Sequence, residues 1–258
     1  MGSTNSDRNS VITRIKRLYK NLKIEPLPGK FNCDYYVECN RSLPKKLRKD
    51  IVTGNWPYIG VNYGKAKIAG KDCRILVVAM DQGGGGEAYG EDFETRQNEW
   101  YGAFFNRVNA HTGGTHLIVK HLVDNKNPED FVAEFAHTNS VKCSPKKEME
   151  QMKSESTAMM RKCCRNHLER ELEIFKPDLI ITEGRGPSDM LKDVLNLSVA
   201  DYQSRDNTTG KVCEVYEGQP IVLAGPHPAR TLKWKYGKSL PSWYRKAIDR
   251  VRKVVEKG

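Results

Sequence analysis

In ILVVAMDQGGGG, residues 75–86, an uninterrupted apolar run meets a polar, glycine-rich loop. Its first six residues are apolar without alternation, which is typical of a parallel strand buried on both faces. Three further runs, at 135–141, 179–181 and 221–224, predict strands of the same kind. Strands that alternate with helical segments predict an α/β fold: three layers, α/β/α, around a central, mostly four-stranded parallel sheet.

The rest of the chain gives weaker signals, and its 258 residues predict one domain. We expect residues 1–9 to be disordered and a helix to begin with Ser10 as its cap. The cysteine-bearing N-terminal segment 33–70 is interrupted by glycine and proline and predicts irregular structure. Apolar residues at helical spacing predict helices over 154–175 and over 242–257, the second of them basic and amphipathic.

Charge points to the class of partner. The chain carries 43 Lys and Arg against 32 Asp and Glu, a net charge of +11, which favours a polyanion such as DNA, single- or double-stranded. No apolar run is long enough to span a membrane, and the N-terminus lacks the apolar core of a secretory signal. We therefore expect a monomer without a membrane partner, in the cytoplasm of a prokaryotic cell at the nucleoid.

Polar residues stand where the predicted strands end, which is where parallel sheets place their sites. Asp81 follows the first strand, Asn139 lies in the second, and His227 follows the fourth between two prolines. Neither a G-x-G-x-x-G nor a Walker motif occurs, which argues against dinucleotide and nucleoside triphosphate sites. An imidazole in a rigid loop can face a base while nearby cations hold phosphates. Such cations follow His227: Arg230, Lys233 and Lys235.

Seven cysteines, an odd number without a secretory signal, argue against a disulfide framework. Cys73 lies beside an apolar strand and Cys213 in a possible hairpin, so both are interpreted as small buried residues. The other five form two groups that suit either a metal site or a buried core. They are Cys33 and Cys39, and then Cys143, Cys163 and Cys164.

Four segments, in this order, resemble motifs of the iron–sulfur (family 4-like) uracil-DNA glycosylases. Residues 139–145 resemble N-x-x-K-C-x-P, residues 164–181 resemble C-x-x-x-L followed by K-P-x-x-I-I, and His227 begins an H-P-A segment. The loop after residue 80 falls where the first motif belongs, although AMDQG at 79–83 stands in place of G-E-A-P-G. Its acid is one position later, which resembles the catalytic Asp of the family 1 motif G-Q-D-P-Y.

The resemblance implies a [4Fe–4S] cluster held by four thiolates. The ligands it implies are Cys33, Cys39, Cys143 and Cys164, with the adjacent Cys163 as the alternative fourth ligand. This sequence departs from the family because five residues, not two, separate the first two cysteines. A structural zinc ion bound by four cysteines has the same ligand count, and the alternative stays open.

The resemblance also implies a DNA glycosylase that flips a base out of DNA and hydrolyses its N-glycosidic bond. Asp81 would stabilise the sugar cation and orient water, and His227 would donate to the leaving base. Four residues would line the base pocket: Gln82, Gly83, Phe93, which would stack, and Asn139, whose amide would pair with a pyrimidine edge. Four would contact DNA: Arg230 or Leu232 as a wedge in the duplex, and Lys233 and Lys235 on phosphates.

Three alternatives remain. Gly83 has no side chain to exclude a C5 substituent, which leaves open, beside uracil, another modified pyrimidine, including a bulky modified cytosine of phage DNA that would be removed in antiviral defence. The divergent first motif suits a DNA-binding iron–sulfur protein without activity. A metal-dependent nuclease would use the acids after the glycines: Glu87, Glu91, Asp92 and Glu94.

Overall fold

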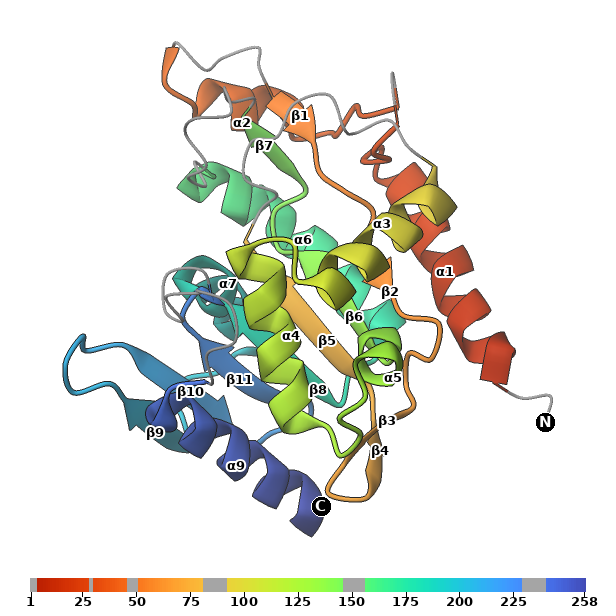
Figure 1. The fold of residues 1–258 in the computed structure, drawn as a ribbon. Coiled ribbons are helices and arrows are strands. Elements are labelled where there is room, and N and C mark those ends of the chain that lie inside the picture. The colour runs from red at the N-terminus through yellow and green to blue at the C-terminus, as the bar shows by residue number, and fades with distance from the viewer. Residues whose placement is uncertain (1–3, 28–29, 46–50, 81–91, 146–155, 229–239) are drawn as a thin grey trace.

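The central sheet has seven strands in the order β2-β6-β5-β8-β11-β10-β9 (Figure 1). This computed structural model describes residues 4–27, 30–45, 51–80, 92–145, 156–228 and 240–258. The strands of the sheet are β2 (Tyr58–Ile59), β5 (Ile75–Ala79), β6 (Phe135–Asn139), β8 (Leu179–Glu183), β9 (Tyr202–Arg205), β10 (Val212–Tyr216) and β11 (Ile221–Gly225).

The four predicted strands are β5, β6, β8 and β11, and they form the parallel centre of the sheet, which confirms the α/β prediction. Every residue of β5, β6 and β8 is buried, because helices cover both faces. The sheet is wider than its four parallel strands, since β2 is added antiparallel at one edge and β10 and β9 at the other. The outermost strand, β9, alternates in exposure as an edge strand does.

Helices cover both faces of the sheet and give the three predicted layers (Figure 1). No helix in the described ranges is long and apolar enough to cross a membrane. One face packs against α1 (Thr4–Asn21), α6 (Ala158–Phe175) and α7 (Arg185–Leu195). The other packs against α3 (Phe93–Asn106), α4 (Ala110–Leu122), α5 (Pro128–Ala133) and α9 (Ser242–Lys257).

Two predicted helices are found, and α9 has the predicted bounds. The helix predicted over 154–175 begins later, because the Thr157 side chain caps α6 by accepting from the amide of Met160. It ends where Lys176 adopts a left-handed conformation (φ 46°) before Pro177.

The N-terminal third differs from its prediction. The first helix begins at Thr4, so residues 4–9 are helical, not disordered, and Ser10 is not its cap. Segment 33–70 is not irregular either: it contains α2 (Tyr36–Arg41), β1 (Ile51–Thr53) and β3 (Ala66–Ile68), which pairs with β4 (Lys71–Cys73). The partner of β1 is β7 (Cys143–Pro145), about ninety residues further along the chain, and local sequence patterns do not report such a pairing.

Candidate active site and cysteine cavity

The carboxyl ends of the parallel strands carry the polar residues of the candidate site. Asn139 ends β6, Glu183 ends β8, and His227 follows two residues after the end of β11. The structure therefore brings Asn139 and His227 to one edge, as the sequence predicted. Nine other candidate residues lie outside the described residues: Asp81, Gln82, Gly83, Glu87, Glu91, Arg230, Leu232, Lys233 and Lys235.

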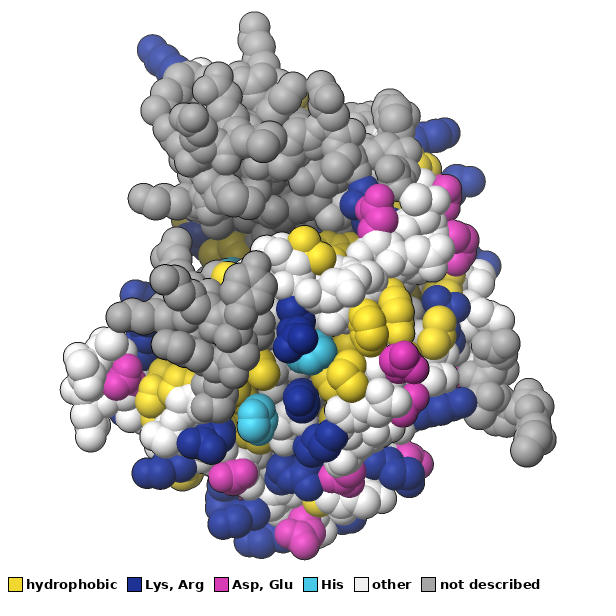
Figure 2. Space-filling view, in the orientation of Figure 1, with side chains coloured by type: hydrophobic (Ala, Val, Ile, Leu, Met, Phe, Trp, Pro, Cys, Tyr) yellow, Lys and Arg dark blue, Asp and Glu magenta, His cyan; other side chains and the backbone are white. Residues whose placement is uncertain are grey.

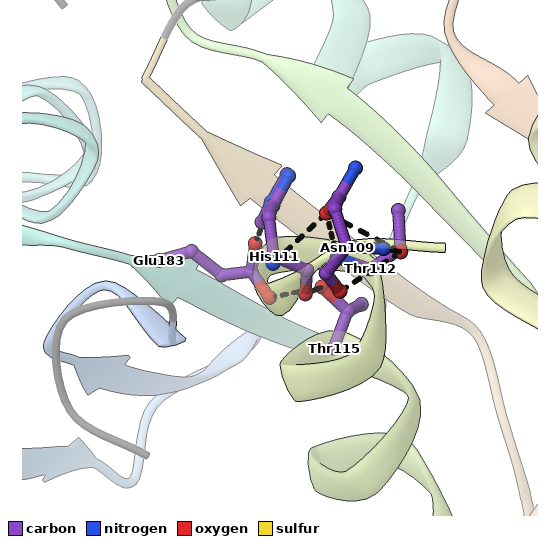
Figure 3. A network of polar contacts seen from close by, with 5 residues as sticks. All are labelled: Asn109, His111, Thr112, Thr115 and Glu183. Carbon is purple, nitrogen blue, oxygen red and sulfur yellow. Dashed lines mark hydrogen bonds and ion pairs between the residues drawn. The ribbon is translucent and has the colours of Figure 1, made fainter. Parts of the chain in front are cut away.

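Glu183 binds two side chains of α4 at this edge (Figure 3). Its Oε2 lies 2.5 Å from Nε2 of His111, and its Oε1 accepts a hydrogen bond of 2.6 Å from the hydroxyl of Thr115. The Glu183 side chain is 1% exposed, whereas that of His111 is 24% exposed. A carboxylate this deeply buried needs such partners, because an unpaired charge in the interior is costly.

The start of α4 fixes the position of His111. Asn109 caps the helix: its side-chain oxygen accepts from the amides of His111 and Thr112, both at 2.9 Å, and the hydroxyl of Thr112 accepts from the backbone amide of Asn109 at 3.2 Å (Figure 3). Thr115 follows one turn after His111, so a single helix turn presents both groups to the two oxygens of Glu183.

The charge of Glu183 governs the ionisation of His111. Burial alone lowers the pKa of His111, but the adjacent carboxylate and its hydrogen bond raise the pKa above its ordinary value. Burial also opposes ionisation of Glu183, yet the charge and hydrogen bond of His111 lower the pKa of that carboxyl. The pairing therefore favours the imidazolium form of His111 and the carboxylate form of Glu183.

Two more histidines flank His111. The ring of His137 on β6 lies 5.5 Å from the His111 ring, and that of His227 lies 5.3 Å from it on the strand β11 side. His137 is buried beneath Trp100, its Nε2 has no hydrogen-bond partner among the described residues, and burial lowers its pKa to about 3. His137 is thus a neutral neighbour of His111.

Gly184 allows the His227 loop to approach the end of β8. Its φ of +112° lies in a region that only glycine adopts readily, and its amide donates to the carbonyl of Gly225 at 2.8 Å. A Cβ at this position would lie 3.4 Å from the Cβ of His227. Gly184, which follows β8, therefore lets the chain turn beside the loop that carries His227.

Asn139 sits above a second buried network, on the opposite face of the sheet. The Lys142 ammonium donates to the backbone carbonyl of Asn139, to the Thr138 hydroxyl at 2.9 Å and to Glu171 on α6 at 2.6 Å. Tyr19 of α1 donates to the other oxygen of Glu171 at 2.6 Å. These hydrogen bonds thus connect the end of β6 to α6 and α1 on that face of the sheet.

Phe93, expected to stack on a base, is the buried first residue of α3. Its buried ring packs against Trp56 with a centroid distance of 5.6 Å, beneath the ammonium of Lys16. The two described acids of the nuclease alternative are also engaged: Asp92 caps α3, and Glu94 pairs with Lys16 at 3.2 Å. Neither is presented as a metal ligand in this structure.

The five cysteines expected at a metal site surround one cavity. Cys33 precedes α2, Cys39 lies on it, Cys143 begins β7, and Cys163 and Cys164 are adjacent on α6. The thiol of Cys39 interacts with those of Cys143 and Cys163, and that of Cys143 also interacts with Cys164. Both alternatives for the fourth ligand therefore reach the cavity.

The chemistry of the cavity suits a group that binds thiolates. Burial raises the pKa of Cys33 to about 11, so its free thiol is protonated at neutral pH, and a bound metal would displace that proton. Cys33 also lies 3.7 Å from Nε2 of His167. Cys73 and Cys213 lie elsewhere, buried in the hydrophobic cluster under α4 and α9, as expected of small core residues.

The model of the Uracil DNA glycosylase superfamily matches residues 69–252. The chain belongs to this superfamily. A comparison with curated proteins finds no match. The matched range contains β5, β6, β8 and β11 with the candidate residues at their ends, and it begins after Cys33 and Cys39.

Superfamily membership supports a DNA glycosylase in general, a hydrolase of the bond between base and sugar. It leaves the iron–sulfur subgroup as a prediction, because half of the expected ligands precede the matched residues. Sequence reasoning missed His111 and Glu183. The available signals were a charged residue that ends the apolar strand 179–183 and the capping pattern N-x-x-T at 109–112.

Proposed function

We propose that this protein is a DNA glycosylase that flips a damaged or modified base out of DNA and hydrolyses its N-glycosidic bond. One observation supports this beyond the family match: Asn139 and His227, expected to read and to release the base, stand at the same carboxyl edge of the parallel sheet. Sites in open α/β sheets form at that edge.

Breaking the N-glycosidic bond builds positive charge on the sugar and negative charge on the base. In our proposal, Asp81 stabilises the sugar cation and orients the attacking water, and His227 donates to the base. Asn139 offers both donor and acceptor atoms to a pyrimidine edge. The fixed backbone carbonyl of Asn139, held by Lys142, favours this reading role, because a side chain that selects a base needs a rigid support.

The base in this proposal is uracil or another modified pyrimidine. In our proposal Gly83, which has no side chain, would not exclude a C5 substituent. A bulky modified cytosine of phage DNA is the variant that would place the protein in antiviral defence, and uracil is the variant that would place it in repair.

DNA is the partner that the charge supports. The net charge is +11, and basic side chains gather over α9 on the face shown in Figure 2. Phosphate contacts of this kind position a protein on DNA without reading its sequence. Arg230 or Leu232 would enter the gap left by the flipped base, and Lys233 and Lys235 would hold phosphates. The exposed basic residues of α9 are Arg245, Lys246, Lys253 and Lys257.

We also propose that the cysteine cavity holds a [4Fe–4S] cluster on Cys33, Cys39, Cys143 and either Cys164 or Cys163. When bound, the cluster would supply a structural cross-link between α2, β7 and α6. A zinc ion is the alternative. Analysis of iron, zinc and acid-labile sulfide in anaerobically purified protein distinguishes them. Four iron and four sulfide per chain would support the cluster, and one zinc per chain without sulfide would favour the zinc ion.

A base-release assay tests the activity. The panel contains oligonucleotides with uracil, hypoxanthine, 5-hydroxymethylcytosine and its glucosylated form, in single and double strands, with Asp81→Asn as control. We expect strand breaks only after alkali or an abasic-site nuclease, and a loss of several orders of magnitude in the Asp81→Asn variant with DNA binding kept. The base that reacts decides between repair and defence.

Two results would replace the proposal. DNA binding without release of any base would favour the DNA-binding protein without activity. Strand breaks that need no alkali and disappear with EDTA would favour a nuclease, whereas water-dependent base release needs no divalent metal.

A further inference from the structure

The His111–Glu183 pair belongs to none of the sequence motifs of the site. We propose that His111 is a second catalytic imidazole, which donates a proton to the departing base, and that Glu183 is the residue that orients it. This inference rests on the proposed glycosylase function and adds a proton donor to it.

The pair has the construction of a catalytic carboxylate–imidazole unit. Both oxygens of Glu183 are committed, one to His111 and one to Thr115, so the carboxylate cannot turn. Because Nε2 of His111 faces the carboxylate, Nδ1 is the nitrogen left to act on a substrate. A buried acid that fixes the ring and tautomer of a partly exposed histidine is the arrangement that serves proton transfer in unrelated enzymes.

The pair lies on the face of the sheet that Asn139 faces. His137 and Asn139 are two positions apart on β6, and side chains at that spacing point to the same face. Thr138, between them, points to the other face, where it meets Glu171. Since the His111 ring lies against that of His137, a base read by Asn139 would lie on the same side of the sheet as His111.

The ring of His111 also lies 5.3 Å from that of His227, the donor expected from the sequence. Two imidazoles therefore lie side by side at this edge of the sheet, and their surroundings differ. Glu183 faces His111 directly and keeps its charge, whereas His137 faces it from β6 as a neutral ring. The charged and titratable groups that face His111 among the described residues are Glu183, His137 and His227.

The proton balance of the step is complete with water as the co-reactant. The C1′–N bond breaks, and its electron pair leaves with the base, which takes a proton from Nδ1 of His111. The oxygen of water forms the new bond to C1′, and the proton that water releases restores the imidazolium. The products are the free base and an abasic sugar, and the pair returns to its starting state.

Single-turnover base release across pH tests the inference, with the reactive base found in the panel. We expect His111→Gln to lower the rate about 100-fold or more with DNA affinity kept, the size of a lost general acid. The rate of the natural protein should fall as pH rises through the raised pKa of His111. Glu183→Gln should move this fall to lower pH, because burial without the carboxylate lowers that pKa.

His121→Gln is the matched control, since His121 is a partly buried histidine on the same helix, away from Glu183. It should keep both the rate and the pH profile. A purely structural role of the pair predicts loss of thermal stability with an unmoved profile, and that result overturns the inference, as does an unchanged His111→Gln rate. A natural protein that releases no base overturns the proposed function and the inference with it.

A metal ion is the remaining alternative occupant of this cluster, because His111, His137 and Glu183 offer ligand atoms within 4.8 Å of one another. Zinc titration of the natural protein and of His137→Gln separates this case. A stoichiometric site that the natural protein has and His137→Gln lacks would overturn the inference, and equal zinc binding by the two proteins supports it.

Discussion

Two glutamates are buried at the carboxyl edge of the sheet, one on each face, and each meets a cationic side chain. Glu171 binds Lys142 on the α6 face, and both side chains are nearly inaccessible, at 0% and 4% exposed. Glu183 binds His111 on the α4 face, where the carboxylate is buried and the imidazole is partly open. The components are alike, but one pair is closed and the other is open.

The difference shows what each pair does. In the closed pair every group has a protein partner, and its cation is an ammonium, so it ties β6 to α6 and α1 permanently. In the open pair the cation is an imidazole, the side chain that gains and loses a proton near neutral pH. The buried carboxylate of Glu171 therefore stabilises the fold on the α6 face. The buried carboxylate of Glu183 positions a reactive imidazole on the α4 face.

The largest effect should come from the closed pair. Lys142→Met leaves Glu171 uncompensated in the interior, and breaking a buried pair in this way costs about 3–5 kcal/mol. Urea denaturation measures the loss. Adding Glu171→Gln to Lys142→Met should recover part of it, because the amide is neutral and can still bond with Tyr19 and Thr138. A single variant as stable as the natural protein would contradict the closed, structural role.

A smaller loss of stability is expected at Gly184, beside the open His111–Glu183 pair, because this residue needs an unusual backbone conformation. Gly184→Ala places a Cβ on a residue with φ +112°, which costs about 1–3 kcal/mol. The loss comes from the backbone conformation and not from a clash, because the added Cβ would lie at an ordinary contact distance of 3.4 Å from the Cβ of His227. Urea denaturation measures it. Gly102→Ala in α3 is the control and should stabilise by up to about 1 kcal/mol, because this glycine is within a helix and has space.

The pH dependence of two neighbouring histidines should run in opposite directions. His111 has a raised pKa, so its stabilising contribution is complete below its unfolded pKa of about 6.5 and is lost as pH rises through the folded pKa. His137 has a pKa lowered to about 3, so it is neutral in the folded state and costs stability as pH falls below about 6.5.

Imidazole NMR titration checks this prediction, because it reports each histidine separately. The two rings are 5.5 Å apart, and we expect the His111 signal to titrate above pH 6.5 and that of His137 to stay neutral to the acid limit of the fold. Titration of both rings near 6.5 would remove the distinction between them. Glu183→Gln should lower the His111 midpoint.

The smallest effect should come from an exposed pair, which gives the baseline for the two buried ones. Lys16 and Glu94 lie 3.2 Å apart with side chains 43% and 67% exposed. Glu94→Gln should change stability by no more than about 0.5 kcal/mol, and salt should cancel the difference. A loss as large as that of Lys142→Met would mean that exposure does not set the value of these pairs.

The centre of the fold was predictable from the sequence because its signal is local. Four apolar runs became the four parallel strands, since helices on both faces leave them no polar side. The edges were not predictable in the same way. Strand β1 exists because β7 pairs with it, and α4 contains two adjacent glycines, which helix propensity disfavours, yet both are buried in its packing.

In the candidate site, too, the residues that belong to local motifs were predictable and those that depend on tertiary contacts were not. Asn139, His227 and the cysteines belong to recognisable motifs, and the structure brings Asn139 and His227 to one edge and five cysteines to one cavity. His111 and Glu183 are 72 residues apart and carry no motif spacing, so their pairing depends on the tertiary fold. Phe93 shows the converse, because a position that fits a motif lies in the core against Trp56.

The cysteine cavity also sets an order of events during synthesis. Its thiols come from Cys33 to Cys164, so the last wall is absent until α6 has left the ribosome, when more than half of the chain is made. Contacts between residues so distant in sequence form late and slowly. Cys33, just before α2, and Cys39, on α2, must therefore wait without their final neighbours until α6 has been made.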